Sequence, residues 1–116
     1  MERKITYQRM VYMLGDKYII AQRYYGVLSV MNGLGLTERE IQLVAYAAIR
    51  GNMSYANIRG EFCERYKTSG ATINNMISKL KRMGIFIKDN GKVKVSPKLI
   101  LNFDNDVVLQ VSMKHE

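Results

Sequence analysis

The amino-acid sequence predicts a small α+β protein: a core of three helices and a β-hairpin, a helical N-terminal extension and a second, C-terminal hairpin. Two observations predict this class. Apolar residues recur at helical spacing between capping signals from residue 37 to residue 83, and an Asn90-Gly91 turn then separates two β-prone runs. The 116 residues fit one domain, with 1–35 as the extension, 36–96 as the core unit and 97–116 as the last hairpin.

The N-terminal extension contains two predicted elements. The β-branched and aromatic residues of Ile5 to Met13 favour a strand, whereas a helix is expected from Tyr18 onward. A hairpin that turns at Gly15-Asp16 is the alternative to that helix. The helix would have one apolar face, made of Ile20, Tyr24, Val27, Leu28 and Met31.

The start of the first core helix has the strongest local signal in the chain. Thr37 is a typical N-cap, and Glu40 stands three residues later, where its side chain can complete a capping box. Apolar residues at helical spacing follow, and Gly51 stands where a left-handed C-cap is expected. These signals predict a helix over Glu38–Arg50.

Two further helices are predicted after Gly51. Ser54 is the expected N-cap of the second helix, which ends before Lys67 and has an apolar face made of Ile58, Phe62 and Tyr66. Ser69 is the expected start of the third helix, which closes at Gly84. The third helix has a continuous apolar stripe made of Ile73, Met76, Ile77, Leu80 and Met83.

The first predicted hairpin, a wing, follows the third helix directly. Its strands, 85–88 and 92–95, stand on either side of Asp89-Asn90-Gly91. Asn-Gly favours a two-residue hairpin turn because both residues tolerate a positive φ. Beyond Pro97, a second hairpin is expected from strands 99–103 and 107–113 around Asp104-Asn105-Asp106. Its last strand alternates cleanly through Val107, Leu109, Val111 and Met113.

The order helix, helix, turn, helix, β-hairpin over Thr37 to Val95 resembles the winged helix-turn-helix family of DNA-binding domains, in its small bacterial or bacteriophage form. The resemblance covers about half the chain and rests on pattern and order. It implies that residues 69–83 take the place of the recognition helix, which enters the major groove of DNA. A nucleic-acid-binding protein, and more narrowly a small DNA-binding regulator of transcription, is therefore the expected function.

The outward face of the third helix supplies candidate base contacts. At about 100° per residue, the side opposite the apolar stripe presents Ala71, Asn75, Ser78 and Arg82, flanked by Thr72, Asn74 and Lys79. Asn can bond adenine with two hydrogen bonds, Arg can bond guanine or phosphate, and small side chains can contact a thymine methyl group. An ordinary solvated helix face would have a similar composition.

Positive charge is concentrated around the predicted wing. The chain has a formal charge of +8, and residues 79–98 hold seven basic residues against Asp89 alone. Lys92 and Lys94 should lie on the strand face opposite Val93 and Val95, where they could contact a phosphate backbone. Protection of a strand edge against aggregation is the other interpretation. The wing residues in the candidate site are Lys88, Lys92 and Lys94.

Several classes of protein have little support from the sequence. Cys63 is the only cysteine and His115 the only histidine, so neither a disulfide nor a four-ligand zinc site is expected. No motif for catalysis or for a cofactor is present. The longest apolar run, Leu43 to Ile49, is far shorter than the roughly 20 residues that span a bilayer. The expectation is a non-enzymatic protein in the cytoplasm of a bacterium or infected host cell, with duplex DNA as its partner.

The sequence also fits a second class of function. A structural or adaptor protein, for example a bacteriophage virion component, could use a winged helix for protein contacts. The N-terminal segment and the last hairpin would then bind neighbouring chains in a homo-oligomer or a larger assembly.

Overall fold

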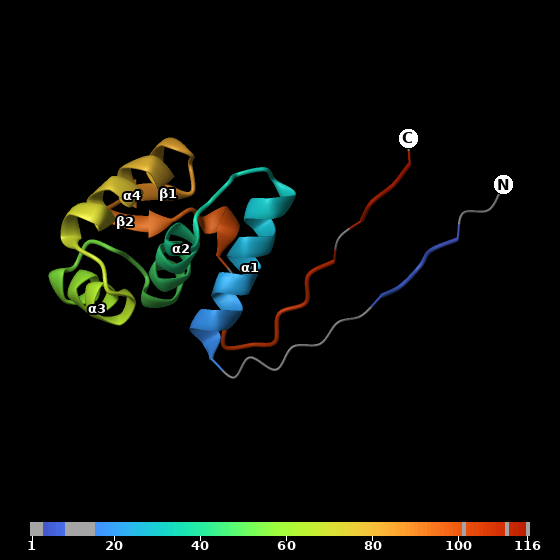
Figure 1. Ribbon diagram of the computed structural model, residues 1–116, viewed down its shortest axis with the longest axis horizontal. Coiled ribbons are helices and arrows are strands. Elements are labelled where there is room, and N and C mark those ends of the chain that lie inside the picture. Colours follow the sequence, from blue (N-terminus) through green and yellow to red (C-terminus); the bar gives the residue numbers. More distant parts are fainter. Residues whose placement is uncertain (1–3, 9–15, 101, 111, 116) are drawn as a thin grey trace.

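The computed structural model describes residues 4–8, 16–100, 102–110 and 112–115. Within these ranges the chain forms an α+β arrangement whose layout is compatible with a winged helix (Figure 1). The elements in chain order are α1 (Lys17–Met31), α2 (Glu38–Arg50), α3 (Ala56–Tyr66), α4 (Gly70–Arg82), β1 (Phe86–Asp89), β2 (Lys92–Val95) and a 3-10 turn, η1 (Pro97–Leu99).

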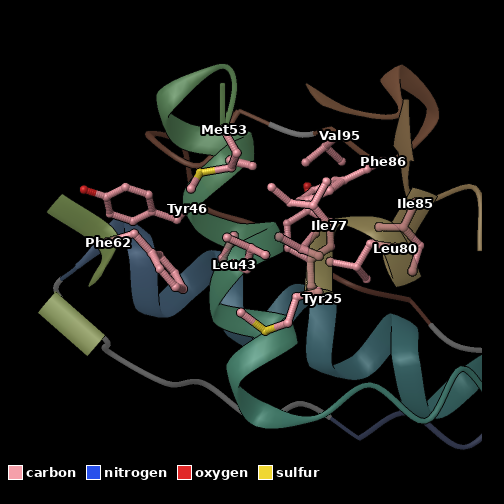
Figure 2. Packing of buried hydrophobic residues seen from close by; sticks show 14 of the residues in the cluster. Tyr25, Leu43, Tyr46, Met53, Phe62, Ile77, Leu80, Ile85, Phe86 and Val95 are labelled. Atoms are coloured by element: carbon pink, nitrogen blue, oxygen red, sulfur yellow. The ribbon is translucent and has the colours of Figure 1, made fainter. Parts of the chain in front are cut away.

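The hydrophobic core surrounds α2, which contacts α1, α3 and β2, while α4 contacts α3 and β1. Figure 2 shows side chains from all of these elements meeting beside α2. Leu80 of α4 and Phe62 of α3 are fully buried, as the apolar stripes predict. The predicted stripe of α4 is confirmed in its four buried members: Ile73, Met76, Ile77 and Leu80.

Local capping fixes the ends of the core helices. The Thr37 hydroxyl accepts a hydrogen bond from the Glu40 N–H, and the Glu40 carboxylate accepts one from the Thr37 N–H, so the predicted capping box is present. Gly51 is left-handed at φ 93° and ends α2. The Ser69 hydroxyl accepts a hydrogen bond from the Thr72 N–H, which confirms the predicted start of the third core helix, α4, at Ser69.

The prediction for the start of α3 was wrong. Ser54 does not cap this helix, which begins after Tyr55 without a side-chain cap. Instead, the amide oxygen of Asn52 accepts from the backbone N–H groups of Ser54 and Tyr55. The Ser54 hydroxyl accepts from the N–H of Val93 in the wing at 2.8 Å. The Ser54 hydroxyl, which its position in the sequence predicts as the N-cap of α3, therefore binds a residue 39 positions away instead.

The helix α1 is present, but its buried face differs from the predicted one. Asp16 caps it, which excludes the alternative hairpin turn at this residue, and the buried positions are Ala21, Tyr25 and Ser29. Two hydrogen bonds explain this orientation: the Tyr25 hydroxyl donates to the Leu99 carbonyl, and the Ser29 hydroxyl accepts from the Leu36 N–H. Of the predicted face, Ile20, Tyr24 and Leu28 flank the core, whereas Val27 and Met31 are exposed.

The two outer β predictions fail in the described residues. Residues 5–8 are not in a strand, and 9–13 lie outside the described residues. No C-terminal hairpin forms over 99–100, 102–110 and 112–113: Leu99 ends η1, and Asp104 lies in a turn. Phe103 explains this difference, because its ring is buried against Tyr24 and Tyr25, with centroids 5.7 and 5.8 Å away. This packing holds the chain along α1 instead of letting it turn back.

Candidate nucleic-acid interface

The outward face of α4 is the centre of the candidate interface. The apolar stripe of α4 is buried, so the opposite side of the helix must face solvent. Six of the seven predicted α4 residues are exposed there: Ala71, Thr72, Asn74, Asn75, Ser78 and Arg82. The structure thus brings these small and polar side chains together along one 13-residue helix.

Lys79, the seventh predicted residue of α4, is held in an ion pair. Its ammonium lies 2.9 Å from the Glu40 carboxylate, and the Glu40 side chain is almost completely buried. The carboxylate also accepts the hydrogen bond from the Thr37 N–H. Because its charge is matched by a buried anion, Lys79 joins α4 to the start of α2. Its side chain is nevertheless 41% exposed beside the other candidate residues of α4.

Asn74 is exposed and also tied to the neighbouring helix. Its amide oxygen accepts a hydrogen bond from the Arg59 guanidinium of α3. Arg59 was not among the predicted site residues, because only the packing of α3 against α4 brings its guanidinium to this face. Arg59 thus adds a positive charge beside Asn74, and it fixes the orientation of the Asn74 amide.

The wing has the predicted Asn90-Gly91 turn, but its first strand is shifted by one residue, so that Asp89 ends β1 instead of lying in the turn. Asn90 and Gly91 both have positive φ, and Asp89 pairs with Lys92 across the strands. Because cross-strand partners share a face, one face of the hairpin carries the basic pair together with an apolar and an acidic residue: Ile87, Asp89, Lys92 and Lys94. Lys88 is exposed but pairs with Val93, so it lies on the other face. The predicted trio of lysines is therefore divided between two faces.

Lys92 and Lys94, which share one face of the hairpin, both have partners within the chain. The Lys92 ammonium lies 4.9 Å from the centre of the Tyr55 ring, and the Lys94 ammonium lies 3.4 Å from the Asp89 carboxylate. Both contacts are near the surface, where such interactions contribute on the order of 1 kcal/mol or less. A phosphate can therefore compete for these ammonium groups. Tyr55, which sequence reasoning missed, joins the candidate surface through this contact.

The loop before α3 holds the wing in place. The Met53 N–H donates to the Val93 carbonyl at 2.9 Å, and the Val93 N–H donates to the Ser54 hydroxyl. At the base of the wing, the Ser96 N–H donates to the Ile85 carbonyl, and the Ile85 N–H donates to the Leu80 carbonyl of α4. These hydrogen bonds join the wing to both α4 and the loop after α2, so the two parts of the candidate surface are held together.

Other polar groups of the described chain lie outside the candidate surface. The Arg50 guanidinium holds the pKa of Glu61 below its ordinary value by a hydrogen bond, and the pair is exposed. Cys63 is a half-buried free thiol. Among the described residues, no three His, Cys, Asp or Glu side chains are grouped so that they could hold a metal ion.

Comparisons with known proteins complete the description of the site. No protein-family model, curated protein or solved structure matches this chain at a significant level. In the part of the chain that the structure describes, no helix is both long and apolar enough to cross a membrane.

Proposed function

We propose that this chain is a winged-helix nucleic-acid-binding protein, a small DNA-binding regulator of transcription, in which α4 reads the major groove and the wing holds phosphates. The observation that carries the proposal is the continuous exposed face of α4, which lies next to a positively charged hairpin. The proposal includes a cytoplasmic location and no enzymatic activity.

The dimensions of α4 suit a groove. Its 13 residues give a helix about 20 Å long, and a helix of about 10 to 12 Å in diameter enters the major groove of B-DNA, which is about 12 Å wide. Asn75 and Arg82 are exposed and belong to none of the ion pairs of the described chain. They are thus available for hydrogen bonds to base edges. Arg59 and Asn74 lie beside them and suit a backbone contact.

The position of the wing favours a phosphate contact over a purely protective role. The edge of β2 at Val93 is already covered by the Met53 N–H and the Ser54 hydroxyl. Lys92 and Lys94 are therefore not needed to shield that edge from another strand. A row of ammonium groups beside a groove-reading helix can instead neutralise phosphates and release their counterions.

The decisive measurement is duplex binding over a series of salt concentrations. If the proposal holds, log Kd rises linearly with log salt, with a slope of about 0.9 for each phosphate contacted. An enriched sequence selected from a random pool should bind more tightly than its shuffled version at the same salt concentration. Weak binding that is insensitive to both salt and sequence would refute the proposal.

Exposed apolar side chains outside the folded body favour a second candidate, a structural or adaptor protein such as a bacteriophage virion component. Ile5, Tyr7 and Val108 are 72, 85 and 90% exposed. Side chains of this kind are suited to contacts between proteins in an assembly. Loss of incorporation into a particle after substitution of Ile5 or Val108, with substitutions on α4 harmless, would support this candidate over DNA binding.

A further inference from the structure

An apolar groove lies on the side of the molecule where the C-terminal half of α1 meets the loop after it and the end of α4. Its volume is about 240 Å³. Apart from Asn32 at one end and the backbone of Gly84, its walls are largely aliphatic and aromatic, and include Tyr25, Leu28, Leu34, Leu36, Met83 and Leu99. A groove of this composition suits an apolar peptide segment.

The same chain carries a segment of matching character. Residues 106–115, the C-terminal arm, form no helix, strand or turn in their described parts, 106–110 and 112–115. Leu109 and Met113 of the arm are 43% and 87% exposed. The arm extends away from the helical body (Figure 1).

The path of the chain separates the arm from the groove of its own copy. The chain passes the groove at Leu99, is fixed to α1 by Phe103, and reaches the N-terminal end of α1, where Asp104 lies 3.4 Å from the Lys17 ammonium. The groove is at the other end of α1, near Leu28. These two positions are eleven residues apart on the helix, or about 16 Å. The arm leaves the body at the end away from the groove.

We propose that the C-terminal arm of one copy binds in the groove of a second copy, with Leu109 and Met113 as the apolar anchors, because they share one face of an extended segment. If each copy places its arm in the groove of the other, the two copies form a symmetric dimer. The groove and the exposed arm of each copy are then both buried. The arm has the alternating apolar pattern of a segment that binds in an extended form. This inference concerns assembly and does not depend on the proposed DNA binding.

The test is the mass in solution of the full chain and three variants, measured by sedimentation over a range of concentrations. The wild type is expected to show twice the mass of one chain. The arm variant, with Leu109→Asp and Met113→Asp, and the groove variant, Leu34→Lys, should each show the mass of one chain. Val30→Asp is the matched control, because Val30 is an exposed apolar residue of α1 that does not line the groove. It should remain a dimer.

Mixing the two defective variants separates arm exchange from a general loss of folding. The arm variant keeps its groove and the groove variant keeps its arm, so the mixture should regain dimers held by one arm. Circular dichroism of each variant checks that the helices are intact. A wild type that remains monomeric at every concentration overturns the proposal. If that monomer is also more stable than the arm variant, the arm binds the groove of its own chain. Dimers that persist in the arm variant would also overturn it.

Discussion

The carboxylate of Glu40 and the ammonium of Lys79 join α2 to α4 at a separation of 2.9 Å, although the two residues are 39 positions apart. Burial of Glu40 by itself favours the neutral acid. Hydrogen bonds from the Thr37 N–H and from Lys79 outweigh this effect, and they lower the pKa of Glu40 below its ordinary value of 4.5. One carboxylate therefore closes the capping box of α2 and fixes the orientation of α4.

Glu40→Gln should make the thermal stability of the protein less dependent on pH in the acidic range. A lowered pKa in the folded state means that the ionised carboxylate stabilises the fold fully above the unfolded pKa, and that this contribution is lost as the pH falls through the folded pKa. The melting temperature of the wild type should thus fall more than that of the variant between about pH 5 and pH 3. Glu38→Gln, an exposed residue of the same helical turn, should follow the wild type. Parallel curves for wild type and Glu40→Gln would contradict the role given to this carboxylate.

Leu80→Ala should destabilise the whole fold. Leu80 is fully buried at the meeting point of α4 with the core, and truncation removes apolar contacts and leaves a cavity. The expected cost is about 2 to 5 kcal/mol in the free energy of unfolding, measured by urea denaturation. Ser78→Ala, two residues away on the exposed face, should stay within about 0.5 kcal/mol of the wild type. Equal midpoints for the two variants would exclude the packing described for α4.

Asn75→Ala should reduce sequence discrimination if α4 enters a groove. Removal of a bidentate hydrogen bond to a base should narrow the difference in binding free energy between a preferred and a shuffled duplex by about 1 to 3 kcal/mol. The measurement is a pair of binding isotherms at one salt concentration. Asn57→Ala, an exposed residue of the same type on α3, is the control and should leave the difference unchanged. If both variants behave alike, Asn75 does not read a base.

Lys92→Ala combined with Lys94→Ala should weaken binding to every duplex to a similar extent. A phosphate contact carries no sequence information, so the preference for one duplex should persist while the salt slope falls by about one for each phosphate that is no longer neutralised. Asp89→Asn should strengthen binding to every duplex, because the Asp89 carboxylate is paired with Lys94 and would repel phosphate. Asp106→Asn, an exposed acid in the arm, serves as its control. An unchanged salt slope in the double variant would remove the wing from the interface.

Signals between residues close in sequence determined much of this fold. The capping box of Thr37 and Glu40, the left-handed Gly51 and the Asn90-Gly91 turn each involve groups no more than four residues apart. Their hydrogen bonds join groups that the local backbone already brings close together, so the sequence sufficed to predict α2, α4 and the wing. The same periodicity that buried Ile73 and Leu80 also placed the candidate groove-reading residues on the opposite side of α4.

Tertiary structure decided what depends on distant partners. The Val93 N–H takes the Ser54 hydroxyl from its expected capping position, Glu40 holds Lys79, and Arg59 reaches Asn74 only because α3 packs on α4. The C-terminal hairpin does not form, because burial of Phe103 against α1 outweighs the strand preference of the residues around it. The sequence pattern limits the conformations and hydrogen-bond partners that each residue can have. Long-range hydrogen bonds and burial select among them, and such contacts exist only once the helices have packed.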